Sequence, residues 1–208
     1  MQNSLKNSLK DFLDVVVEEP AFETLEKDAN SVDKLIWVHN LWMNAIPEVK
    51  KKRLTETETI WVTALPKELT WAIVSVLSGS YASSFMIMQN VFEMLIRSVT
   101  IEGPIGKRIS DIAFLDDDEK TEFKDLWRNF GAIAHPYEKW FKILPFESWT
   151  YFRYNRTACK YCVDYLLRVS DFMMVVALEK GFCEPENVSE GINALGLKFS
   201  QKRLEKLK

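Results

Sequence analysis

The feature that most constrains the fold is a stretch with no charged side chain, which runs from Leu69 to Phe92. A segment of that length could cross a bilayer as a helix. It also carries five serines, a glutamine and an asparagine, which is more polarity than a typical inserted helix contains. We therefore expect a helix buried on nearly every side at the centre of a protein core, and no membrane partner.

The remaining pattern predicts an all-α helical bundle around this long apolar helix. Seven glycines and seven prolines are too few for the frequent turns of a many-stranded β protein. Apolar residues recur at three- and four-residue steps, as expected for amphipathic helices. The expected helices cover residues 3–19, 33–44, the uncharged stretch continued to 99, 116–135, and 149–180.

Several local signals mark the ends of these helices. Asn30 and Ser31 can cap the second helix, and the acidic residues 116–119 suit the start of the fourth. Gly181 is a natural stop for the last. That last helix shows a polar stripe opposite its apolar face; the stripe consists of Arg153, Arg156, Lys160, Asp164, Arg168 and Asp171.

The length of 208 residues fits one domain, which we expect over residues 1–182. Residues 183–208 are more polar and are expected to form a small C-terminal appendage. Its last eleven residues hold five basic side chains against Glu205, a net charge of +4. The first residues lack the apolar core of a signal peptide, and three cysteines do not form a disulfide framework. These features favour a cytoplasmic protein.

The candidate functional residues are Arg128, Asn129 and His135, because Arg grips phosphate oxygens and His exchanges protons near neutral pH. Pro136 places His135 at a helix end. Seven residues of helix put Arg128 and His135 about 10 Å apart on one face, so the two side chains could bracket a phosphodiester. Asn129 could orient the cation or the substrate. The alternative is a histidine that caps a helix C-terminus beside a surface arginine.

This arrangement resembles the HEPN domain (higher eukaryotes and prokaryotes nucleotide-binding). The family motif is an Arg followed by a polar residue and, after a short gap, a His; Arg128-Asn129 and His135 match it at the upper limit of that gap. The segments Ala134-His135-Pro136, Gly79-Ser80-Tyr81 and Phe92-Glu93 also resemble family sequences. The resemblance spans residues 66–180, which would be the HEPN-like core.

The resemblance implies a metal-independent endoribonuclease without a cofactor, in which two copies of the chain form a homodimer around one RNA path. His135 would be the general base or acid, Arg128 would stabilise the phosphate and Asn129 would support it. Glu93 on the preceding helix could fix the arginine, although Arg97 is placed to pair with it instead. Basic residues 50–53 and the basic C-terminal residues could guide RNA or a nucleotide phosphate to this site.

Some family members are toxins that carry a His, any residue and then a Tyr, and that are paired with a protein antitoxin. Tyr137 matches this position, with a substrate-stacking or structural role expected first. The resemblance therefore suggests a prokaryotic toxin, defence or stress setting. Phe130, Ala132 and Ile133 make the motif interior apolar, which keeps a second hypothesis open: a catalytically inactive HEPN-like module for dimerisation, nucleotide binding or partner binding.

Two other groups of residues have simpler interpretations. Cys159 and Cys162 have metal-like spacing, but structural zinc needs four ligands, so we expect buried thiols and no metal site. His39 lies between Trp37 and Trp42, and we expect a satisfied histidine in the core or in an interface.

Overall fold

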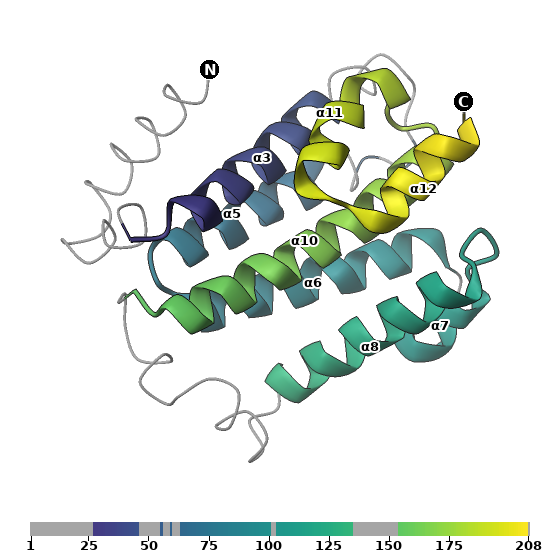
Figure 1. The fold of residues 1–208 in the computed structure, drawn as a ribbon. Helices are drawn as coiled ribbons and strands as arrows, with labels where there is room; N and C mark the ends of the chain where they lie inside the picture. Colours follow the sequence, from purple (N-terminus) through teal and green to yellow (C-terminus); the bar gives the residue numbers. More distant parts are fainter. Residues whose placement is uncertain are drawn as a thin grey trace.

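The computed structural model describes residues 27–45, 55, 59, 63–100, 103–134 and 154–207, with only the backbone for 131–134. Within these ranges every regular element is an α-helix, which confirms the all-α prediction. The helices are α3 (Ala29–Ala45), α5 (Leu65–Leu77), α6 (Tyr81–Val99), α7 (Ile105–Asp111), α8 (Asp117–Ala134), α10 (Arg156–Glu179), α11 (Pro185–Leu195) and α12 (Lys198–Leu207) (Figure 1). The helix expected at 3–19 lies outside the described residues.

The uncharged stretch forms two helices, so the expectation of one long buried helix is wrong. α5 ends at Leu77, and Gly79 follows with a φ of 72°, in the left-handed region. The N–H of Ser80 donates to the carbonyl of Ser75 and that of Gly79 to the carbonyl of Val76, which is the Schellman pattern of a helix end. The chain reverses there and α6 packs along α5.

α10 is the central helix of the bundle. It contacts α3, α5, α6, α8 and α12, and its residues from Val169 to Leu178 are all buried. Figure 1 shows it crossing the middle of the molecule, with α8 and α12 on different sides of it. Gly181, with a φ of 64°, follows its end and confirms the predicted stop.

Local caps determine where two other helices begin. The N–H of Glu119 donates to the side chain of Asp116 at 3.0 Å, and the N–H of Asp116 donates to the Glu119 carboxylate at 2.8 Å. This reciprocal capping box starts α8 and confirms the acidic cap. At α3 the prediction was one turn too late, because Asp28 accepts the N–H of Ser31 at 3.2 Å and the helix begins at Ala29.

The C-terminal residues form two helices that share the main core. α11 packs on α3, where Gly191 brings the backbone close to Leu41, and α12 packs on α10. Their buried apolar residues belong to the same cluster as those of the earlier helices; they are Val188, Ile192, Leu195, Leu197, Phe199 and Leu204. The domain boundary after residue 182 stays a prediction. Among the described helices, none has the length and apolar character needed to cross a bilayer.

Candidate functional site

Arg128 and Asn129 lie on the exposed side of α8, near its C-terminal end. The Arg128 side chain is 73% exposed, and its guanidinium donates to Asp125 at 2.7 Å within the same helix. The next residue, Phe130, is fully buried. The centre of its ring lies 5.8 Å from the centre of the Phe92 ring of α6 and 5.5 Å from that of the Tyr165 ring of α10. Phe130 thus anchors this end of α8 to the core.

His135 and Tyr137 lie outside the described residues, so their position relative to Arg128 stays a prediction. Ala132 and Ile133 are described as helix, without their side chains. Residues 50–53, the internal basic cluster, are also outside the described ranges.

The supporting role proposed for Glu93 requires an ion pair with Arg128, but its described partner is another arginine. It pairs with Arg97 at 2.5 Å, one helical turn further along α6. Both side chains line a cavity of about 340 Å³ that Glu68 of α5 also lines. Among the described residues, Glu93 and Arg128 therefore belong to separate ion pairs, as the spacing of Glu93 and Arg97 suggested.

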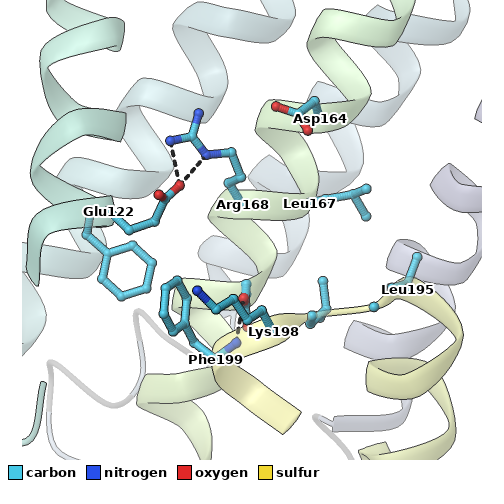
Figure 2. A pocket seen from close by; sticks show the side chains of 11 residues that line it. Glu122, Asp164, Leu167, Arg168, Leu195, Lys198 and Phe199 are labelled. Atoms are coloured by element: carbon cyan, nitrogen blue, oxygen red, sulfur yellow. Dashed lines mark hydrogen bonds and ion pairs between the residues drawn. The ribbon is translucent and has the colours of Figure 1, made fainter. Parts of the chain in front are cut away.

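A pocket that the sequence did not indicate lies between α8, α10 and the turn from α11 to α12 (Figure 2). Its volume is about 280 Å³. On one side Arg168 donates from Nε and Nη2 to the same oxygen of Glu122, at 2.7 and 2.6 Å. The Arg168 guanidinium also lies over the Tyr165 ring, 5.2 Å from its centre. These contacts hold one wall of the pocket in place.

Asp171, at the base of this pocket, belongs to the polar stripe of α10 in the sequence, but another helix covers it. It is buried and accepts the N–H groups of Phe199 and Ser200, at 3.0 and 2.8 Å, and the Ser200 hydroxyl. Burial raises the pKa of the Asp171 carboxyl, while these hydrogen bonds act in the opposite direction. Asp171 is thus the cap of α12, supplied by another helix.

Two basic residues of the C-terminal helix are held by acids. Arg203 is buried and donates to Glu119 at 2.7 Å, to Glu179 at 3.0 Å and to the carbonyl of Phe114. Lys202 pairs with Asp116, whose pKa is lowered by its hydrogen bonds with the Glu119 backbone and with Lys202. Arg203 is therefore unavailable for guiding RNA, and Lys202 could do so only by leaving Asp116.

The three cysteines are buried free thiols, which confirms the expectation for Cys159 and Cys162. Burial raises the pKa of Cys159 and of Cys183 to about 12, so neither thiol ionises near neutral pH. In the described part of the chain, no cluster of His, Cys, Asp and Glu could hold a metal ion. His39 is half-buried on α3, and its Nδ1 has no hydrogen-bond partner among the described residues.

The sequence matches no protein-family model, and neither a curated protein nor a solved structure matches it. What the chain does must therefore be argued from its own residues.

Proposed function

We propose that the protein is a HEPN-like, metal-independent endoribonuclease whose site is built around Arg128, Asn129 and His135. The observation that carries the proposal is the state of Arg128, a highly exposed guanidinium whose only described ion pair is with Asp125 in the same helix. Ion pairs of this exposed, intrahelical kind contribute about 0.3–0.5 kcal/mol. A phosphodiester can replace Asp125 at little cost and offers the guanidinium two oxygens.

The neighbouring residues suit the same use. Asn129 is exposed beside Arg128, so its amide is available to a substrate. Phe130 on the opposite side is fixed between Phe92 and Tyr165, which holds α8 so that Arg128 and Asn129 face outward. Electrostatic stabilisation of a phosphate requires donors whose position is fixed before the substrate binds, and the anchored α8 fixes the backbone that carries Arg128.

In the proposed reaction the 2′-hydroxyl of the RNA attacks the adjacent phosphorus and the bond to the 5′ oxygen breaks. His135 takes the proton of the attacking hydroxyl or supplies one to the leaving 5′ oxygen, and Arg128 stabilises the charge on the phosphate. The products are a cyclic phosphate and a 5′-hydroxyl. No metal and no cofactor take part in this scheme. Glu93 is left out, because its described partner is Arg97.

The test is cleavage of a fluorescent single-stranded RNA in the presence of EDTA. The wild-type protein should cut it, and His135→Ala should lose about a hundred- to ten-thousandfold in rate. Arg128→Ala should be similarly impaired. Arg97→Gln is the matched control, since Arg97 is also an exposed arginine in an intrahelical ion pair, and it should cleave at the wild-type rate. Intact RNA with the wild-type protein would rule out the ribonuclease.

The same samples test the alternative hypothesis of an inactive module. RNA that is bound but not cut, with binding weakened by Arg128→Ala, would favour a nucleotide- or RNA-binding protein. Affinity should fall as salt concentration rises if phosphates are the ligand.

We further propose that the active species is a homodimer in which the two copies of α8 face one RNA. Light scattering at micromolar concentration should give twice the mass of the chain. A monomer that still cleaves RNA would contradict the shared site but would leave the ribonuclease itself intact.

We also propose a prokaryotic toxin or defence setting, with a protein antitoxin as the partner. Induced expression in a bacterial host should stop growth with the wild-type chain and with Arg97→Gln, but not with His135→Ala. Growth arrest by His135→Ala as well as by the other two proteins would point to a cause other than RNA cleavage.

A further inference from the structure

The pocket between α8, α10 and the turn from α11 to α12 has two charged residues without an ionic partner in the described part of the chain. Asp164 on α10 and Lys198 at the start of α12 are both exposed, and neither forms an ion pair with another described residue. The other charged groups of the pocket are engaged, Arg168 with Glu122 and Asp171 with the first N–H groups of α12.

These two free charges lie at opposite ends of the pocket. Asp164 and Asp171 are seven residues apart on α10, which is about 10 Å along the helix axis. Lys198 lies at the Asp171 end, because the N–H of the next residue, Phe199, donates to Asp171. Figure 2 shows Asp164 above the pocket and Lys198 below it. A ligand that meets both must therefore be elongated and must carry a cation at one end and an anion at the other.

One wall between the two charges is apolar. It consists of the side chains of Leu167, Leu195, Leu197, Phe123 and Phe199. The Lys198 ammonium lies 4.8 Å from the centre of the Phe199 ring, which places it at the edge of this wall. The volume of about 280 Å³ suits a small metabolite and lies near the lower end of the range for ligand pockets.

We propose that this pocket binds a dipeptide with apolar side chains and with both termini free. Two residues at about 3.5 Å each separate the ammonium and carboxylate groups by roughly 7 Å, a length that suits two charged residues placed about two helical turns apart along the pocket. The ammonium group pairs with Asp164 and the carboxylate with Lys198, while the side chains cover the leucine wall. A single amino acid is too short, because its charged groups flank one carbon atom. This site is separate from the one proposed for RNA.

Calorimetric titration with leucyl-leucine tests the proposal. The wild-type protein should bind leucyl-leucine and should bind leucine at least about tenfold more weakly, since leucine can meet only one charge at a time. Acetylating the amino end of the dipeptide, or amidating its carboxyl end, should each weaken binding roughly tenfold.

Two variants connect each loss to a residue. Asp164→Asn should lower the affinity for the free dipeptide. The variant should then bind the free and the N-acetylated dipeptides with equal affinity. Lys198→Gln should likewise lower the affinity for the free dipeptide and should bind the free and the C-amidated dipeptides with equal affinity. Glu190→Gln on α11 and Lys206→Gln on α12 are controls of the same kind on exposed residues outside the pocket, and they should bind like the wild type.

The wild-type measurements alone can overturn the proposal, whatever the variants do. Absence of leucyl-leucine binding at millimolar concentration would overturn it. Equal binding of the free and N-acetylated dipeptides would also overturn it and would point to the C-terminus of a longer chain as the ligand. RNA cleavage is measured separately, so failure of this proposal does not affect the ribonuclease.

Discussion

The Asp171 carboxylate accepts the backbone N–H of Ser200 at 2.8 Å, and so a residue of α10 caps a helix that begins 27 positions later. The first N–H groups of a helix have no partner inside the helix. At α12 these groups are buried against α10, so the acceptor has to come from the protein itself. Asp171 supplies it from the middle of the central helix, where an acidic residue would otherwise be unfavourable.

Replacing Asp171 by Ala should therefore lower the free energy of unfolding by about 2 kcal/mol or more, since it leaves the buried N–H groups of Phe199 and Ser200 unpaired. Urea unfolding followed by circular dichroism measures the change. Asp164→Ala on the same helix is the control, because Asp164 is exposed and caps nothing, and it should change stability by less than about 0.5 kcal/mol. Equal losses in the two variants would contradict the capping role.

Arg203→Ala should be among the most damaging single changes, with a loss of about 3–5 kcal/mol, because it leaves the Glu119 carboxylate buried without its cation. Adding Glu119→Gln to Arg203→Ala should restore part of this loss. Lys202→Ala removes a neighbouring but partly exposed pair and should cost less than about 1 kcal/mol. The prediction fails if the double variant has a lower free energy of unfolding than Arg203→Ala alone, because Glu119→Gln would then add its own loss and restore nothing.

Gly79→Ala and Gly106→Ala should change stability in opposite directions. Gly79 has a φ of 72°, where an L-residue is strained, so alanine should cost about 1–2 kcal/mol. Gly106 is in α7, is not in the left-handed region, and has open space where a Cβ would lie. Alanine there should add about 0.5 kcal/mol by restricting the unfolded chain. Thermal melts of both variants test this, and a stabilised Gly79→Ala would show that the reversal does not depend on glycine.

The pH dependence of stability should contain a contribution from His39. Burial lowers its pKa below 6.5, and the neighbouring Asn40 side chain offsets this lowering only in part. Below pH 6.5 the unfolded chain therefore binds a proton that the folded protein resists, and stability decreases as the pH falls. His39→Gln should remove this decrease, so unfolding free energies of the two proteins should diverge between pH 7 and pH 5. Parallel curves would show that His39 titrates equally in both states.

The parts of the fold that sequence reasoning could predict depend on neighbouring residues. The capping box of Asp116 and Glu119 and the stop at Gly181 each need only a few adjacent positions. Gly79 is harder, since a glycine inside a helix costs only about 1 kcal/mol and apolar residues recur at helical spacing on both sides of it. The packing of α5 on α6 favours a turn at Gly79 over one continuous helix. The residues of a single helix give no information about that contact.

The candidate site shows the same limit. The exposure of Arg128 and the pairing of Glu93 with Arg97 follow from helical spacing and were open to prediction. The burial of Asp171 could not be predicted, because a 3.6-residue period assigns this residue to the polar stripe whether or not another helix covers it. The pocket beside it depends on how α12 folds back, and nothing in the local pattern of α10 records that.

The contacts of Arg203 also bear on when the protein can finish folding during its synthesis. Glu119 and Phe114 are translated long before Arg203, and until residue 203 has left the ribosome exit tunnel the buried carboxylate of α8 has no cation. The earlier helices can associate as they emerge, but the final packing of α8 against the bundle must wait for the last helix. A nascent chain stalled before residue 203 should therefore remain sensitive to protease and available to chaperones.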